Sequence, residues 1–277
     1  MIFVELEHSR LHVVPFGKGH RKVLAIPGWL EPLDSFFPLS EAFEQNAADL
    51  RLCLVDLPGI GASTRRGARG FSLRDYAQDL WELIDELQWG SLTLMGHSLG
   101  GTIACTMALM RPEQIQSLIL IDSQPGGASP DLWPKDKETL ERLCETVQTL
   151  PEKAFPRMLP RLMHQGLIGN HVEASLWQKL RPIVAAIPPQ VARETIASLV
   201  KTNLQPYLGE ITAPTLDVLG TEDPLRMPPE YDLLLRLPHC QRREIPGAGH
   251  TPLLDAPEAL AASITDFLTH LPTRVAA

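Results

Sequence analysis

The chain has 277 residues, of which 44% are hydrophobic and 21% are charged, and this composition is typical of a globular protein with one sizeable core. Its 33 acidic residues outnumber 25 basic ones, so the net charge of −8 argues against a nucleic-acid partner. No apolar run approaches the roughly 20 residues of a membrane span, and residues 1–8 lack the features of a secretion signal. We therefore expect a cytoplasmic protein with no nucleic-acid and no membrane partner.

Segments typical of strands and of helices alternate along most of the chain. Short apolar runs predict eight strands, near residues 2–6, 11–16, 23–27, 51–56, 92–96, 117–122, 215–219 and 241–245. Helical patterns lie near residues 38–47, 72–88, 98–110 and 256–270. This alternation predicts an α/β fold with a mainly parallel sheet.

The segment Gly-His-Ser-Leu-Gly at residues 96–100 follows one predicted strand directly and opens a predicted helix. This order is the nucleophile elbow, in which a sharp turn exposes a serine hydroxyl at the edge of a sheet. Small glycines let the strand and the helix approach closely enough for that turn. We therefore predict that Ser98 is a nucleophile, and that His97 packs or forms hydrogen bonds locally.

A serine hydroxyl is a weak nucleophile, so the elbow requires a histidine base and a carboxylate that orients it. His250 lies in a glycine-rich loop after the strand near 241–245, and Asp223 lies in a loop after the strand near 215–219. The chain order Ser, Asp, His is the one expected for this elbow. Asp122, which ends the strand near 117–122, is an alternative for the acid, whereas Glu222 is expected to point elsewhere.

With these motifs the chain resembles the α/β-hydrolase superfamily. Two further segments are similar to that family: Pro-Gly-Trp at residues 27–29, after a strand, and Asp-Leu-Pro-Gly-Ile-Gly at residues 56–61. The resemblance implies an eight-stranded, mainly parallel sheet with helices on both faces, and an oxyanion hole formed by the backbone N–H groups of Trp29 and Leu99. Pro27 stands where many relatives have histidine. This difference leaves the oxyanion donor in place, because the donor is the backbone N–H of Trp29.

Between residues 124 and 200 the alternation stops, and prolines punctuate helical patterns such as Glu138–Leu150 and Val191–Leu204. Because relatives carry a helical lid after the sixth strand, the resemblance implies that residues 124–200 form a cap. Residues 1–123 and 201–277 would then form the hydrolase core. His164 and His171 are candidates to line the pocket beneath the cap, and otherwise they are surface residues.

The sequence implies no cofactor and no metal. Its histidines and acids lack the spacing of a metal site, and its glycine-rich turns lack the ending of a phosphate-binding loop. The four cysteines, Cys53, Cys105, Cys144 and Cys240, are scattered, which predicts reduced thiols that serve packing.

The predicted reaction is hydrolysis of the ester or thioester bond of a small molecule through an acyl-enzyme intermediate. Two alternatives stay open: a C–C bond hydrolase or cofactor-free oxygenase with the same three residues, and a ligand receptor without catalysis. The stretch from Lys153 to Arg181 contains five basic residues and one acidic residue. In residues 27–29, residues 56–61 and the placement of the cap, the chain is also similar to the pimeloyl-carrier methyl ester esterases, which use a basic cap. This resemblance and the basic stretch make an acidic acyl-carrier protein a further candidate partner. The oligomeric state is left open.

Overall fold

A nine-stranded sheet forms the centre of the protein in a computed structural model that describes residues 1–45, 49–125, 134–165, 172–225 and 232–271. The strands are β1 (Ile2–Glu5), β2 (Ser9–Phe16), β3 (Arg21–Ile26), β4 (Leu50–Val55), β5 (Thr64–Arg65), β6 (Leu92–His97), β7 (Ile115–Ile121), β8 (Thr215–Gly220) and β9 (Cys240–Ile245). Their order is β1-β2-β4-β3-β6-β7-β8-β9, with β5 beside β2. All eight expected strands are present. The ninth, β5, has two residues, too few to produce an alternating pattern.

The strands from β4 to β9 along the sheet are parallel, whereas β1, β2 and β5 pair antiparallel, so the predicted mainly parallel sheet is confirmed. Ile26 at the end of β3 pairs with Gly96 of β6, and His97 pairs with Ile121 at the end of β7. This register aligns the carboxyl ends of the central strands at one edge. Loops leaving that edge are therefore close neighbours, which is where α/β sheets bind ligands.

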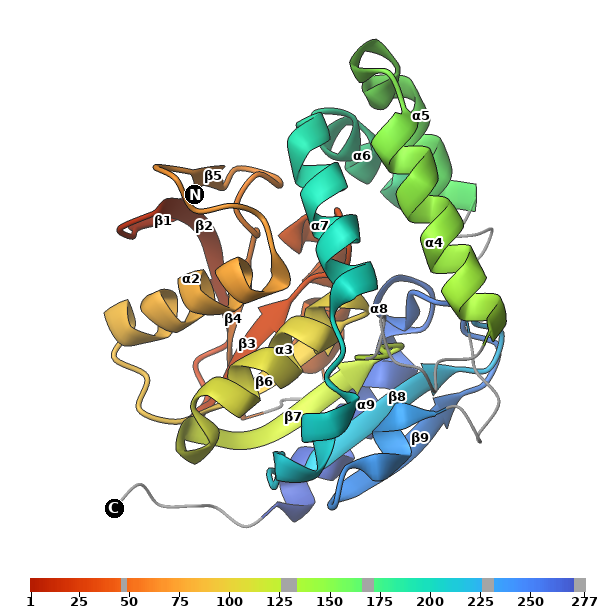
Figure 1. Cartoon of the computed structure of the whole chain (residues 1–277). Helices are drawn as coiled ribbons and strands as arrows, with labels where there is room; N and C mark the ends of the chain where they lie inside the picture. Colours follow the sequence, from red (N-terminus) through yellow and green to blue (C-terminus); the bar gives the residue numbers. More distant parts are fainter. Residues whose placement is uncertain (46–48, 126–133, 166–171, 226–231, 272–277) are drawn as a thin grey trace.

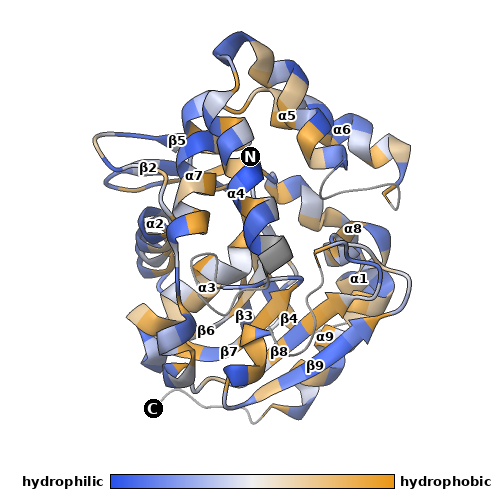
Figure 2. Cartoon of the chain, turned by 45° about the vertical axis from the view of Figure 1, so that its right-hand side comes forward, coloured by the Kyte–Doolittle hydropathy of each residue, from blue (hydrophilic) through white to orange (hydrophobic). Residues whose placement is uncertain are grey.

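Helices cover both faces of the sheet, with α2 (Leu73–Glu86) and α3 (Leu99–Met110) in front of it in Figure 1 and α9 (Pro257–His270) behind it. Helices α1 (Phe37–Gln45) and α8 (Pro252–Asp255) pack against α9. The covered strands β6 and β8 are buried at every residue, whereas edge strand β9 is polar and partly exposed, as its blue colour in Figure 2 shows. No helix in the described ranges is both long and apolar enough to cross a membrane.

In the described residues between β7 and β8 lie four α-helices: α4 (Pro134–Thr149), α5 (Phe155–Met163), α6 (Ala174–Ala185) and α7 (Pro189–Lys201). Figure 1 shows that they rise beyond the edge of the sheet at which the carboxyl ends lie. Helices α4 and α7 correspond to the two helical patterns of the sequence. Pro160 and Pro182 lie inside α5 and α6, and these prolines explain why the helical pattern is weaker in both segments.

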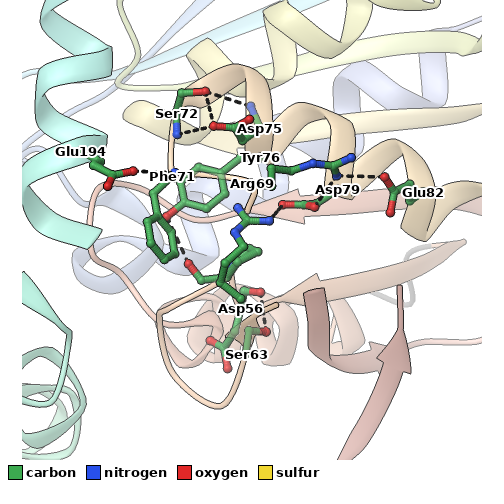
Figure 3. Close-up of polar contacts among 12 residues, drawn as sticks. Asp56, Ser63, Arg69, Phe71, Ser72, Asp75, Tyr76, Asp79, Glu82 and Glu194 are labelled. Carbon is green, nitrogen blue, oxygen red and sulfur yellow. Dashed lines mark hydrogen bonds and ion pairs between the residues drawn. The ribbon is translucent and has the colours of Figure 1, made fainter. Parts of the chain in front are cut away.

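Helix α7 is fixed to the sheet-covering layers by polar contacts that span more than 120 residues of chain. Glu194 accepts a hydrogen bond of 3.0 Å from the backbone N–H of Phe71, just before α2 (Figure 3). The next residue of α7, Thr195, accepts at its Oγ1 a hydrogen bond of 2.9 Å from the indole Nε1 of Trp29. The position of α7 is thus tied both to α2 and to the loop after β3.

Strand β5 is held by a buried ionic cluster, part of which is drawn in Figure 3. Asp79 on α2 is fully buried and accepts hydrogen bonds from Arg65 of β5 and, at 2.7 Å, from Arg69. Burial raises the pKa of Asp79, while the two guanidinium groups act in the opposite direction. The cluster attaches the two-residue strand β5 to helix α2, a contact that local sequence patterns do not predict.

Candidate active site

Ser98 occupies the turn between β6 and α3 with φ 49° and ψ −118°, a strained conformation for a residue with a side chain. Glycines on both sides make this turn sterically possible. A Cβ atom at Gly96 would overlap the backbone of Gly100, and a Cβ atom at Gly100 would overlap the carbonyl oxygen of Ile26 on β3. The spacing of the glycines therefore lets β6, α3 and β3 meet tightly around the serine.

The strained turn has hydrogen bonds on both sides of Ser98. Its N–H donates to Ile121 O at 2.9 Å, and its carbonyl accepts a 2.7 Å hydrogen bond from the hydroxyl of Ser123. Sequence reasoning missed Ser123. Its position just after β7, next to Asp122, could have indicated a role, because the register brings this end of β7 to the same edge as the elbow.

The structure brings Ser98, His250 and Asp223 together in one hydrogen-bonded chain. His250 Nε2 lies 3.0 Å from Ser98 Oγ, and His250 Nδ1 lies 3.0 Å from Asp223 Oδ2. The imidazole is buried, and the second oxygen of Asp223 accepts the N–H of Leu225 at 2.8 Å. Burial opposes ionisation of Asp223, but His250 and the hydrogen bonds outweigh it and lower the pKa of this carboxyl.

Asp122, the alternative acid, is hydrogen-bonded to Asp223 rather than to His250. Its Oδ1 accepts the backbone N–H of Gly220 at 2.9 Å. Burial, and next the charge of Asp223, raise the pKa of Asp122 well above its ordinary value. Because two carboxylates this close share a proton, Asp122 carries it and donates to ionised Asp223. The side chain of Glu222 is exposed.

The two predicted oxyanion donors lie on adjoining backbone segments beside Ser98. Leu99 is the first residue of α3, whose first N–H groups have no partner within the helix and point along the positive end of its dipole. Trp29 lies in the loop after β3. The start of α3 touches that loop, since a Cβ at Gly100 would lie 2.6 Å from the carbonyl oxygen of Pro27.

Two pockets adjoin at Gln165, which contributes to both. The first, about 270 Å³, is mostly apolar and is lined by Trp29, Thr139, Leu140, Leu143, Leu162, Gln165 and Leu225. Two of these residues also belong to the surroundings of the candidate site: the Trp29 N–H is a predicted oxyanion donor, and the Leu225 N–H binds Asp223. The second, about 320 Å³, is lined by Arg157, Pro160, Arg161, His164, Gln165, Trp177 and Arg181. It is strongly basic.

The histidines predicted as pocket candidates differ in outcome. His164 lines the basic pocket, where its ring lies 5.2 Å from that of Trp177, and not the site around Ser98. His171 lies outside the described residues. Within the described ranges, no three His, Cys, Asp or Glu side chains form a cluster able to hold a metal ion. Burial raises the pKa of Cys53 and of Cys105 to about 12, so both stay thiols.

Comparison with known proteins extends over most of the chain. Residues 22–257 match the family described as alpha/beta hydrolase fold. The chain is 31% identical over 222 residues to a pimeloyl-[acyl-carrier protein] methyl ester esterase of Yersinia enterocolitica, covering 78% of this chain and 82% of that protein. It is 29% identical over 261 residues to the enzyme of the same name from Edwardsiella ictaluri, covering 91% and 94%. A thermophilic esterase from Thermogutta terrifontis has a similar structure, with a TM-score of 0.81 and 24% identity over 99% of this chain and 100% of that one.

Proposed function

Since this chain belongs to the alpha/beta hydrolase fold family and is an ester-cleaving hydrolase, we propose that Ser98, His250 and Asp223 are its catalytic residues. The observation that carries this assignment is the hydrogen-bonded chain from Asp223 through His250 to Ser98, with 3.0 Å at both links. It joins a base to a serine held on a strained turn, which is the arrangement that activates a serine hydroxyl.

The geometry gives each group a role in acyl transfer. Ser98 Oγ attacks the ester carbonyl while His250 Nε2 takes its proton and then gives it to the leaving alcohol. Asp223 holds the proton of His250 on Nδ1, which leaves Nε2 free to accept. The N–H groups of Trp29 and Leu99 stabilise the tetrahedral oxyanion. Water, activated by His250, then attacks the acyl-enzyme and releases the acid.

Labelling of Ser98 tests this assignment. A fluorophosphonate probe should modify the wild-type protein at Ser98, because only an activated serine attacks it. Ser98→Ala should lose the label and on the order of 10³-fold or more of ester turnover while keeping its fold by circular dichroism. A folded variant that keeps about a tenth of wild-type activity would exclude Ser98 as the nucleophile.

For the substrate, we propose a methyl ester on an acyl chain attached to an acidic carrier protein. The two relatives are named for such esters, and the apolar pocket next to Trp29 suits an acyl chain. At Gln165 this pocket meets the one lined by Arg157, Arg161 and Arg181. Clustered guanidinium groups steer and bind anionic groups such as phosphate or the carboxylates of a carrier. Residues 124–200 then act as a cap that selects the substrate.

Charge-removal variants compared at several salt concentrations test this substrate. Arg157→Ala/Arg161→Ala should lower kcat/KM for the carrier-linked ester by about tenfold at low salt, and the loss should shrink as salt rises. The same variant should hydrolyse a neutral p-nitrophenyl ester like wild type.

The matched control is Lys137→Ala/Arg142→Ala on α4, because both side chains are exposed and lie outside the arginine pocket. It should leave both rates unchanged. Equal effects of the two double variants, or no preference of wild type for the carrier-linked ester, would assign the enzyme to small neutral esters.

A further inference from the structure

Glu31 and His97 form a buried ionisable pair that the reaction described above does not use. His97 Nδ1 lies 2.9 Å from Glu31 Oε2, and both residues are at most 5% exposed. The other ring nitrogen, His97 Nε2, lies 2.6 Å from the backbone carbonyl oxygen of His250. Glu31 Oε2 also accepts the N–H of Gly28 at 2.9 Å.

These partners determine where the protons are. A carbonyl oxygen only accepts hydrogen bonds, so His97 Nε2 carries a proton and donates it to His250 O. The other nitrogen faces a carboxyl group. Burial opposes both charges, but mutual attraction and hydrogen bonding raise the pKa of His97 and lower that of Glu31. These directions favour an imidazolium with two donating nitrogens, paired with a carboxylate.

The pair lies between three segments of the candidate active site. The pair holds the turn that carries the Trp29 N–H, because Glu31 binds the N–H of Gly28. His97 is itself the residue before the nucleophile, and it holds the loop of the base by its bond to the carbonyl oxygen of His250. Gly28 packs directly on the pair, since a Cβ there would lie 2.9 Å from both Glu31 Oε2 and His97 Nδ1. The three segments are separated by up to about 220 residues of sequence and meet at this contact.

We propose that Glu31 and His97 are positioning residues that fix the oxyanion turn, the nucleophile elbow and the base loop relative to one another. This proposal rests on the proposed function, because it concerns the geometry of the same reaction. The pair also has an electrostatic role. The rings of His97 and His250 lie 5.2 Å apart, so a lone charge on either member of the pair would bias the protonation of the base. As an ion pair, the two charges largely cancel at His250.

Among the described residues, the groups that act most strongly on this pair belong to the same site. His97 interacts with Glu31, with the His250 carbonyl and, at longer range, with Asp223, and Glu31 interacts with His97 and His250. Replacing His97 by glutamine leaves the Glu31 carboxylate buried without its counter-charge. That carboxylate favours the protonated, inactive form of His250, so the acid limb of the kcat/KM profile should move to higher pH.

A cycle of three variants tests the proposal: His97→Gln, Glu31→Gln and the double variant. His97→Gln should lower kcat/KM for p-nitrophenyl acetate by about 100-fold, because the unpaired carboxylate displaces the turn and the base. Glu31→Gln should cost less, since His97 can release its Nδ1 proton and accept a hydrogen bond from the amide. The double variant should recover to within about tenfold of wild type, with the acid limb back at its original pH.

The matched control is the exposed pair of His20 and Asp49, whose Nδ1 and Oδ1 atoms lie 3.2 Å apart. His20→Gln and Asp49→Asn should change neither activity nor the acid limb, singly or together. A double variant at positions 31 and 97 that is at least as impaired as His97→Gln, or an acid limb that does not move in His97→Gln, would overturn the proposal.

Two further measurements separate this proposal from the proposed function. Nitrogen-15 spectra of the wild-type histidines should show both ring nitrogens of His97 protonated at neutral pH, and a neutral His97 ring would overturn the ion pair even if His97→Gln fails to fold. In urea unfolding, the double variant should likewise regain free energy of unfolding that His97→Gln loses. If Ser98→Ala stays active, the proposed function is wrong, yet the spectra and the unfolding cycle still decide whether the pair exists.

Discussion

The two neighbouring carboxyl groups, Asp223 and Asp122, should respond very differently to the same isosteric change. In Asp223→Asn an amide NH₂ can face His250 Nδ1 at the 3.0 Å contact. The ring then accepts at Nδ1 and carries its proton on Nε2, which faces Ser98 Oγ. In that tautomer the base cannot take the serine proton.

The expected loss in kcat for Asp223→Asn is about 10⁴-fold, the effect of a wrong tautomer in a serine triad, or about 5 kcal/mol at 1.36 kcal/mol per tenfold. Asp122→Asn keeps the oxygen that accepts from Gly220 N–H and places an N–H where Asp122 now donates its proton to Asp223. Its cost should not exceed that of one ordinary hydrogen bond, about 1 kcal/mol or fivefold.

Initial rates with p-nitrophenyl acetate at pH 7 to 8, after active-site titration of each variant, measure both effects. Asp122→Ala is the informative control. It leaves the buried Gly220 N–H without an acceptor, so it should lower the free energy of unfolding by about 1–3 kcal/mol. If Asp122→Asn lost as much activity as Asp223→Asn, or more, the acid would have to be reassigned to the end of β7.

Three further predictions concern the framework of the site. Gly100→Ala should abolish activity and destabilise the fold, because its Cβ would overlap backbone of β3 that cannot move aside; wild-type activity and melting temperature would refute this. Trp29→Phe should lower the free energy of unfolding by about 1 kcal/mol through loss of the 2.9 Å bond to Thr195, measured in urea, whereas an unchanged value would mean that the bond contributes nothing. Burial, only partly offset by Arg242, raises the pKa of Asp217 to about 6, so ionising it disfavours the folded state as pH rises from about 4 to 6. Asp217→Asn should therefore gain up to about 3 kcal/mol relative to wild type between pH 4 and 7, and a pH-independent difference between the two unfolding curves would contradict that pKa.

The strands and the elbow could be predicted because local sequence determines them. A buried parallel strand is a short apolar run, and the turn at Ser98 needs glycines at fixed offsets. The boundaries agree within a few residues, with α3 beginning at Leu99 and α9 at Pro257. Strand β5 depends instead on the contact of Arg65 with Asp79, which only the fold creates.

The surroundings of the site could be predicted only in part, because their contacts join distant parts of the chain. The run of basic residues was visible, but not that α5 and α6 place Arg157, Arg161 and Arg181 around one pocket. Likewise His97 was expected to bond locally, and its partner Glu31 lies 66 residues away. Patterns of hydropathy and spacing carry no information about such pairings.

The bond between the indole of Trp29 and the hydroxyl of Thr195 restricts how this enzyme can be re-engineered. The segment between β7 and β8 invites replacement as a module, since it enters and leaves the sheet at neighbouring strands. Yet Thr195, on one of its helices, binds the side chain of Trp29, and the backbone N–H of Trp29 is a proposed oxyanion donor. A chimera that takes this segment from a relative therefore also needs a hydrogen-bond acceptor at the position of Thr195, so specificity and reaction rate cannot be exchanged independently here.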